Sequence, residues 1–400
     1  MAGKRDGRSR DAHAAIQSHR VARLSHRDDI HLDDTARPHL CVPNEVLVAR
    51  DDLRVVEAGL SQVGATELEV VPPLTERVAR FQIPGHEHVS DVVTQLRSRG
   101  LDSAARVGPN HVVTGLPNVQ GGPASFAIAS NEQIDFADGA GAGARVAVLD
   151  TGFAPKVHQW LDEHTDAGPG TSEDLDLHPR NGWLDDESGH GTFIAGLILA
   201  RVPSATIEIA KVLDSEGYGT ELDVARALIA HGGADVINLS LGCYSHDDLP
   251  PVALTEALRH VAPTTAVVAA AGNDSTQRPL WPAAHKRVLA VAAVDDSLER
   301  AAFSNFGWWV DAAARGVEVL STFVEFDEVG HVKPIGGREP QDFHGWARWS
   351  GTSFAAPKLS AEIVARMARD QGMSAREAAA AILASPTRPQ SPELGIILDL

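Results

Sequence analysis

From residue 143 onward the chain alternates short apolar runs with helical patterns, and this alternation limits the folds that it can adopt. The apolar runs are rich in Val, Ile and Ala, and they cover residues 145–149, 206–213, 234–239, 265–271 and 288–294. Runs of this length and composition are typical of strands buried on both faces of a parallel sheet. Helical patterns separate them at 191–200, 221–232 and 252–261. We therefore expect a doubly wound α/β domain whose ligand site lies beyond the carboxyl ends of its strands.

A smaller unit precedes this domain. Strands are expected at 45–49, 68–71, 77–83 and near 104–107, and two helical patterns between them stop at Gly64 and Gly100, the first with Asp51 or Asp52 as its N-cap. The order βαββαβ predicts a ferredoxin-like fold in which two helices cover one face of a four-stranded sheet. The next stretch is rich in Gly, Pro and Ala. The predicted division is a disordered polar arm at 1–40, the small domain at 41–113, a linker at 114–140 and the main domain at 141–400.

Charge and composition exclude several classes of protein. The 54 acidic residues exceed the 35 basic ones, for a net charge of -19, and no basic stripe interrupts that excess, so nucleic acid is not an expected partner. No apolar run approaches the roughly 20 residues that a membrane span needs. The first 40 residues lack the apolar core of a secretory signal peptide, and the two cysteines imply no disulfide framework. A cytoplasmic setting is the simplest interpretation, with secretion by another route left open.

Three residues stand where a strand ends or a helix begins: Asp150, His190 and Ser353. Each alone has an ordinary structural explanation, because a strand-end Asp can cap a helix, a single His is commonly structural, and Gly-Thr-Ser before a helix is a common cap. Together, in the order Asp, His, Ser, they match one of the known chain orders of the nucleophile–base–carboxylate triad.

The sequence around these residues resembles the subtilisin-like (subtilase) family from about residue 143 to the C-terminus. The motifs that carry the resemblance are Asp-Thr-Gly at 150–152, His-Gly-Thr at 190–192, Gly-Thr-Ser-Phe-Ala-Ala-Pro at 351–357, Ala-Ala-Gly-Asn at 270–273 and Phe-Ser-Asn-Phe-Gly at 303–307. The resemblance implies a serine endopeptidase that hydrolyses polypeptides through an acyl-enzyme and needs no cofactor. Ser353 would be the nucleophile, His190 the base, Asp150 its orienting carboxylate and Asn273 a donor to the oxyanion. Two alternatives remain: a silent peptide-binding pseudoprotease, or a regulatory processing protease that docks partners through residues 1–140.

The same resemblance extends to substrate and metal sites. Ser240, Leu241 and Gly242 would form the substrate-binding strand, and Leu280 would line the primary specificity pocket. The short 196–211 connection lacks the family's Asn-rich calcium loop, so no metal is expected there. We interpret the carboxylates of 162–187 as a solvated acidic loop in preference to a cation site, and Cys243 as a packed residue in preference to a redox switch.

The unit at about 43–113 also resembles the inhibitor-type propeptide of secreted subtilases, including the Gly-Pro-Asn-His stretch at 108–111. The resemblance implies intramolecular inhibition, with the tail after Val113 in the active-site cleft and self-cleavage within 112–128. A permanently attached docking domain is the alternative.

Overall fold

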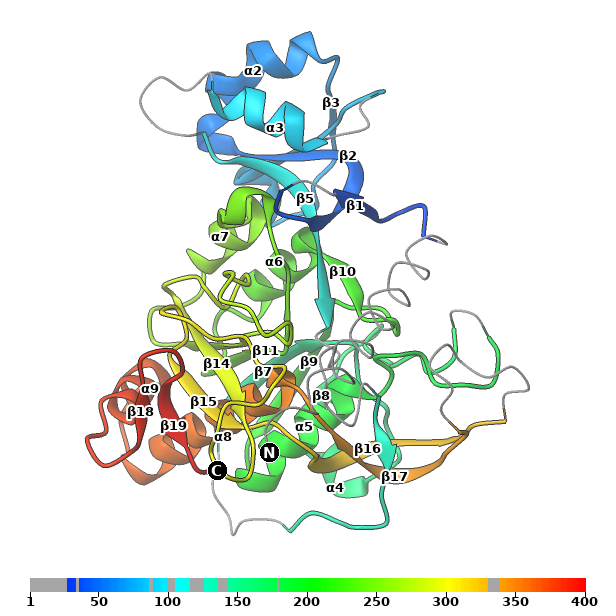
Figure 1. Cartoon of the computed structure of the whole chain (residues 1–400), viewed down its shortest axis with the longest axis vertical. Coiled ribbons are helices and arrows are strands. Elements are labelled where there is room, and N and C mark those ends of the chain that lie inside the picture. The colour runs from blue at the N-terminus through cyan, green and yellow to red at the C-terminus, as the bar shows by residue number, and fades with distance from the viewer. Residues whose placement is uncertain are drawn as a thin grey trace, which may run out of the picture.

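The computed structural model describes residues 27–33, 36–85, 89–98, 105–115, 126–135, 141, 143–177, 180–329 and 339–400. Within them, a nine-stranded sheet of order β18-β19-β15-β14-β13-β11-β7-β9-β8 forms the centre of the main body (Figure 1). Its strands are β7 Arg145–Asp150, β8 Thr165–Ala167, β9 Thr206–Lys211, β11 Val236–Leu239, β13 Ala266–Ala270, β14 Val288–Val294, β15 Ala312–Arg315, β18 Gln390–Ser391 and β19 Gly395–Leu398. All neighbours from β8 to β19 pair in parallel, and the order reverses at β7. The expected α/β fold is confirmed.

Helices pack against this sheet because its central strands β11, β13 and β14 are buried along their whole length. On one face, α5 (His190–Arg201) packs against α8 (Thr352–Arg369), and α8 also contacts β11, β13, β14 and β15. The helices α6 (Glu221–Ala230) and α7 (Val252–Leu258) pack against each other. The remaining elements of the body are α4 (Gln159–Glu163), α9 (Ala375–Leu383), η3 (His246–Asp248) and a small sheet of β16 (Val319–Asp327), β17 (Asp342–Trp349) and β6 (Ile128–Ala129).

The N-terminal unit follows the expected βαββαβ order with different bounds. It consists of β1 His31–Asp33, β2 His39–Ala49, α2 Leu53–Gln62, β3 Thr66–Leu68, β4 Val78–Gln82, α3 Val89–Ser98 and β5 Val107–Gly115, with 3₁₀ turns at Arg50–Asp52 and Leu74–Glu76. The sheet order is β5-β2-β4-β3, and β1 pairs with β2. In Figure 1, α2 and α3 lie on the outer side of this sheet, and α6 and α7 lie on the other side, toward the main body.

Strand β2 shows why this sheet is buried on both faces. Val46 and Val48 pack with the apolar residues of α2 and α3 in a core of their own. Leu47 and Ala49, which alternate with them, belong to the core of the main body. Because successive side chains of a strand point to opposite faces, the sheet is a layer between two helix pairs. The apolar face that a small domain would otherwise expose is covered by the rest of the chain.

Three sequence predictions about this region are wrong in detail. Part of the predicted disordered arm is ordered, since β1 and the start of β2 lie before residue 41; residues 1–26 lie outside the described residues. The last strand is β5 at 107–115, well beyond 104–107, because β5 gains partners from the main body that no local pattern encodes. The predicted linker contributes Thr114 and Gly115 to β5 and residues 128–129 to β6, which pairs with β17; its residues 116–125 and 136–140 lie outside the described residues.

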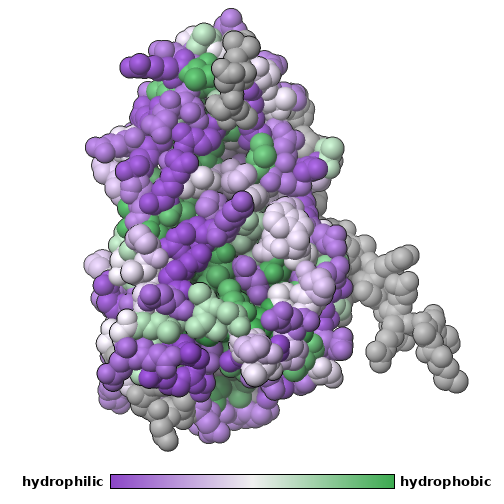
Figure 2. Space-filling view, turned by 90° about the vertical axis from the view of Figure 1, so that its left-hand side faces the viewer, coloured by the Kyte–Doolittle hydropathy of each residue, from purple (hydrophilic) through white to green (hydrophobic). Residues whose placement is uncertain are grey.

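Smaller differences have local causes. Strand β3 ends at Leu68, ahead of the predicted 68–71. Asp52 occupies the N-cap position of α2, but its carboxylate makes no cap and accepts from the backbone N–H and guanidinium of Arg106. No helix among the described residues is both long and apolar enough to cross a membrane. The face in Figure 2 is mostly hydrophilic, with apolar side chains in small interspersed patches.

Candidate active site

Asp150 and His190 meet at the carboxyl edge of the large sheet. Asp150 is the last residue of β7, His190 is the first residue of α5, and both are fully buried. His190 Nδ1 lies 2.7 Å from Asp150 Oδ1. The backbone N–H of Thr151 also donates to this oxygen at 2.8 Å. This contact fixes the tautomer in which Nδ1 carries the proton and Nε2 is left as the basic nitrogen.

Ser353 is placed by the first turn of α8 and by a buried hydrogen-bond network. Gly351 precedes the helix and Ser353 is its second residue. The Ser353 hydroxyl donates to the Ser240 carbonyl oxygen at 3.4 Å, and the Ser240 hydroxyl donates to the Ser353 carbonyl oxygen at 2.8 Å. Asn238 connects Ser240 to Ser360 on the next turns of α8. The predicted substrate strand and the predicted nucleophile are therefore joined directly.

Asn273 is oriented by the residue next to Ser353. The backbone N–H and the hydroxyl of Thr352 donate to Asn273 Oδ1 at 2.9 and 3.0 Å. The Thr352 hydroxyl in turn accepts from the N–H of Gly272 at 3.0 Å. With the acceptor end of the amide fixed in this way, the donor Nδ2 is the end that can address a charge beside Ser353.

Aromatic rings enclose the imidazole. Trp349 contacts His190 edge-on, with ring centroids 5.4 Å apart at 87°, and Phe354 lies 5.4 Å away. Phe193 packs against both of these rings. We will call Asp150, His190 and Ser353 the candidate triad.

Two carboxylates near the candidate triad, the partly buried Glu173 and the fully buried Glu187, were not identified from the sequence, and they correct the interpretation of 162–187 as a solvated loop. Glu173 accepts from the hydroxyls of Thr151 and Thr192 and, at 2.9 Å, from the N–H of Gly189. Glu187 is fully buried, and its Oε2 lies 3.8 Å from His190 Nε2. Asp185 is buried as well. No local sequence pattern distinguishes these residues from their exposed acidic neighbours, because packing against α5 buries them.

These carboxylates control the charge of the imidazole. Burial alone lowers the pKa of His190, but Asp150, Glu187 and Glu173 outweigh it and raise that pKa to about 9. Burial raises the pKa of the Glu173 carboxyl, although the hydrogen bonds from Thr151 and Thr192 act to lower it. The surrounding carboxylates therefore favour the charged form of the imidazole.

A strand from the N-terminal unit lies beside the candidate triad. The end of β5 runs between β10 (Tyr218–Thr220) and β12 (Leu241–Gly242) and pairs antiparallel with both. Figure 1 shows β5 reaching down beside β10. On one side Thr114 is opposite Tyr218. On the other side Thr114 is opposite Gly242 and Gly115 opposite Leu241. The N–H of Gly115 donates to the Gly217 carbonyl at 2.7 Å. Residues 112–115 thus fill the space between β10 and β12 as one extended strand.

Leu280 lies directly beneath this strand-binding surface. Its side chain is 1% exposed, and a Cβ at Gly242 would lie 2.6 Å from Leu280 Cδ2. Cys243 is also buried, which agrees with its interpretation as a packed residue, and burial raises the pKa of its thiol well above the usual value.

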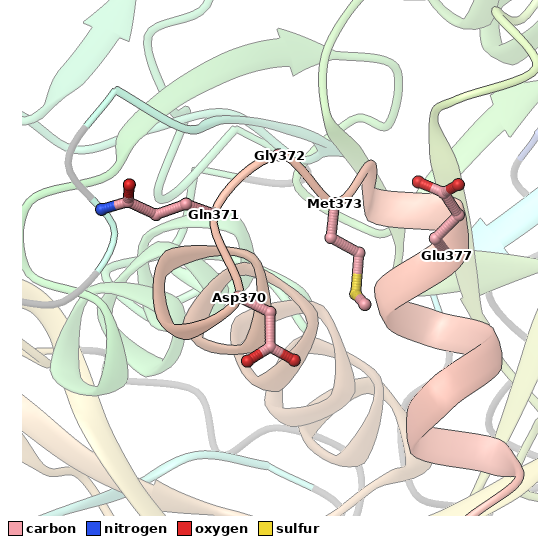
Figure 3. Close-up of a pocket in the computed structure, with 5 residues that line it drawn as sticks. All are labelled: Asp370, Gln371, Gly372, Met373 and Glu377. Atoms are coloured by element: carbon pink, nitrogen blue, oxygen red, sulfur yellow. The ribbon is translucent and has the colours of Figure 1, made fainter.

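Other hollows and possible ion sites lie apart from this arrangement. One hollow is lined by Asp370, Gln371, Gly372, Met373 and Glu377, at the junction of α8 and α9 (Figure 3). It follows the last residue of an 18-residue helix whose other end carries Ser353, so about 25 Å of helix separates the two. Among the described residues, no group of three or more His, Cys, Asp or Glu side chains is arranged to hold a metal ion.

Comparison with known proteins decides the family. Residues 141–394 match the Subtilase family. The chain belongs to the subtilase family. This subtilase is 33% identical over 325 residues to "Thermophilic serine proteinase" of Bacillus sp. (strain AK1), covering 75% of this chain and 71% of the relative. It is 33% identical over 255 residues to "Thermitase" of Thermoactinomyces vulgaris, covering 60% of this chain and 80% of the relative. Together these matches make the subtilase a subtilisin-like serine endopeptidase.

A solved structure supports the fold. Fervidolysin from Fervidobacterium pennivorans, described as a keratinolytic enzyme related to subtilisin, superposes with a TM-score of 0.58 at 21% identity. The superposition covers 86% of this subtilase and 57% of the fervidolysin chain. At that identity the likeness shows a common fold.

Proposed function

We propose that this subtilase cuts peptide bonds through Asp150, His190 and Ser353. Ser353 Oγ attacks the peptide carbonyl while His190 Nε2 takes its proton, and the same proton then goes to the leaving amine. The acyl-enzyme is released by water, again with His190 as base. Asp150 keeps the proton on Nδ1 and stabilises the imidazolium without taking the proton itself. The observation that carries this proposal is the 2.7 Å contact between His190 and Asp150, beside the helix start that bears Ser353.

The oxyanion would be stabilised by two donors. One is the backbone N–H of Ser353, which stands at the positive end of the α8 dipole. The other is Asn273 Nδ2, held by the bonds from Thr352 to Oδ1. The Ser353 hydroxyl must turn from Ser240 toward His190 for the proton transfer, a tightening that substrate binding commonly brings about.

A fluorophosphonate probe tests this proposal, because only an activated serine reacts with it. We expect labelling of the active protein, none of Ser353→Ala, and normal labelling of Ser297→Ala, which changes an exposed serine. His190→Ala should abolish nearly all turnover, and combining it with Ser353→Ala should cost little more, since the members act as one unit. A folded protein that neither labels nor cuts would instead be a peptide-binding pseudoprotease.

We further propose that the N-terminal unit inhibits the protease intramolecularly. Its support is the pairing of residues 112–115 with β10 and β12, beside the candidate triad. A contact network outside the cleft adds to it, since Arg106 pairs with Glu256 of α7 and Arg27 with Asp214. An arriving peptide would have to displace this strand.

Two measurements separate inhibition from simple docking. A chain of residues 126–400 is expected to fold poorly or to be more active, and adding residues 27–115 in trans should rescue folding or inhibit cleavage. Intact mass during activation should show cleavage within 112–128. A fragment that folds and cuts normally, with no response to the added unit, would mean that the unit is a permanent docking domain.

A further inference from the structure

Gly115 lies directly against the side chain of Glu187. A Cβ added to Gly115 would lie 2.8 Å from Glu187 Oε2, 3.0 Å from Cδ and 3.3 Å from Cγ. We propose that Glu187 is a specificity-determining residue that restricts this position of a bound peptide to glycine and excludes acidic residues most strongly. The proposal rests on the proposed function, because it concerns which peptides that cleft accepts.

The register of β5 against β12 indicates which residue of a bound peptide would take the place of Gly115. Gly115 is opposite Leu241, and Ser240, which precedes Leu241, holds the Ser353 hydroxyl. Because the strands are antiparallel, a peptide in this register would bring its next residue opposite Ser240, at the nucleophile. The residue in the place of Gly115 is therefore the second one before the bond that is cut.

Glu187 has little room to withdraw. On its other side lies Gly217, where a Cβ would be 2.4 Å from Glu187 Cγ. Its backbone is fixed by a hydrogen bond from Glu187 N–H to the Ser215 carbonyl at 3.0 Å. The side chain is thus packed between two glycines and the imidazole of His190, 3.8 Å from its carboxylate.

The obstacle at Gly115 is the glutamate and not the backbone. Gly115 does not have a positive φ, so an L-residue can adopt its backbone conformation. Gly108, on the same strand, is a matched comparison, because a Cβ there would find its nearest atoms at an ordinary 3.5 Å. A side chain should be tolerated at residue 108 and rejected at residue 115.

Hydrogen exchange in the full chain tests this without any catalysis. In a Ser353→Ala background, we expect Gly115→Ala to speed amide exchange in residues 112–115 by about tenfold or more, the discrimination that one buried methyl group commonly produces. Gly108→Ala should leave exchange there nearly unchanged. Adding Glu187→Ala to Gly115→Ala should restore slow exchange. Fast exchange that Glu187→Ala does not rescue, or no effect of Gly115→Ala, would overturn the proposal.

Peptide kinetics test the same residue during turnover. Peptides that differ only in the second residue before the cut carry Gly, Leu, Asn or Asp. The active protein should cleave the Gly peptide with a kcat/KM about tenfold or more above that of the Leu peptide. In Glu187→Gln this preference for Gly should remain, but the Asp and Asn peptides should be cleaved with equal kcat/KM. In Glu187→Ala the preference for Gly over Leu should disappear. Equal cleavage of Gly and Leu peptides would refute the proposal. If no peptide is cut and Ser353 does not label, the proposed function fails, and the exchange cycle still decides the role of Glu187.

Discussion

His190 takes its charge from three carboxylates that reach it from different segments. Asp150 comes from the end of β7, while Glu173 and Glu187 come from the long loop before α5. They raise the pKa of His190 to about 9, although a general base must be neutral to accept a proton. These carboxylates therefore favour the charged form of the imidazole, whereas the proposed base works in its neutral form.

Replacing Glu187 by Gln should shift the pH dependence of activity. Loss of one neighbouring negative charge lowers the pKa of His190, so the neutral imidazole persists to lower pH. We expect the acidic limb of the kcat/KM profile of the activated protease to move to lower pH. Glu299→Gln, an exposed charge on the main body, is the control and should leave the limb in place. A profile that does not move in Glu187→Gln would show that its carboxylate does not influence His190 during turnover.

We expect Glu173 to act by holding the start of α5 in position. Glu173→Ala leaves the hydroxyls of Thr151 and Thr192 and the N–H of Gly189 without their acceptor, at a cost of about 2–4 kcal/mol in the free energy of unfolding. Since Gly189 is the N-cap of α5, kcat should fall more than KM rises. Denaturant unfolding and steady-state kinetics measure the two effects, with the exposed Glu163→Ala as control. Unchanged stability would contradict this role for the Glu173 carboxylate.

How far the sequence predicts these residues depends on how local their signals are. Asp150, His190 and Ser353 were identifiable because each stands at a strand end or helix start inside a short motif. Glu173 and Glu187 were not, since acidic residues are frequent in their stretch, and the contacts that single them out, of Glu173 with α5 and of Glu187 with β5, come from other parts of the chain. A property created by distant contacts leaves no local pattern.

At the scale of elements, the junction of β11, β12 and α8 determines where Ser353 stands. Ser360 donates to Asn238 Oδ1 at 2.9 Å, Asn238 Nδ2 donates to the Ser240 hydroxyl at 3.0 Å, and Ser240 donates to the carbonyl of Ser353. All four residues are buried. The chain of bonds connects the third turn of the helix to the segment between β11 and β12.

Ser360→Ala should loosen this junction. It leaves the buried Asn238 carbonyl oxygen without that donor, which costs about 1–3 kcal/mol of stability. We expect kcat to fall while KM for short peptides changes little, because the nucleophile and not the peptide strand loses its support. Ser297→Ala, at an exposed site, should have no effect on either quantity. A lower melting temperature with unchanged kcat would indicate that the network stabilises the fold without positioning Ser353.

Strand β5 shows the limit of element prediction. The central strands of the sheet were predictable because both faces are apolar and their residues form short Val- and Ala-rich runs. The Gly-Pro-Asn-His sequence of β5 has a turn-like composition, and it becomes a strand because β2, β10 and β12 supply partners along its length. Its true length is a property of the assembled chain.

At the scale of the molecule, three buried histidines meet where the N-terminal unit joins the main body. His39 of β2 and His111 of β5 have ring centroids 5.6 Å apart, and His246 of η3 lies 5.5 Å from His39. Burial and His111 lower the pKa of His39 to about 4, burial and Arg97 lower that of His111 to about 3, and burial lowers that of His246 to about 4, against the effect of Asp247. The other charged or titratable groups that act on the three rings are Asp33, Glu221 and Arg278.

Acid should therefore weaken the joint. Each ring is neutral when docked and takes up a proton below its free value of about 6.5 once released, so release is favoured as pH falls from about 6.5 toward 4. Glu221 acts in the opposite direction, since burial raises its pKa to about 8 and its docked form holds a proton. Three histidines outweigh one glutamate, and residues 27–115 should bind a Ser353→Ala fragment of 126–400 at least about tenfold more weakly at pH 5 than at pH 7.

Calorimetry at the two pH values measures that difference. His39→Gln, which removes one titrating ring, should make the pH dependence shallower. Binding that is as tight at pH 5 as at pH 7 would mean that the histidines stay neutral or that the joint tolerates their charge.

The covalent connection between β5 and the main body has a consequence for binding. While the strand of residues 112–115 and its cleft belong to one continuous chain, their encounter is unimolecular, and the strand faces the cleft at an effective concentration on the order of millimolar. Diluting the protein changes nothing in that equilibrium. A single cut after β5 would turn strand and cleft into two separate molecules. The fraction of cleft occupied by the strand would then fall with dilution, so the same contacts would dissociate after the cut although they persist before it.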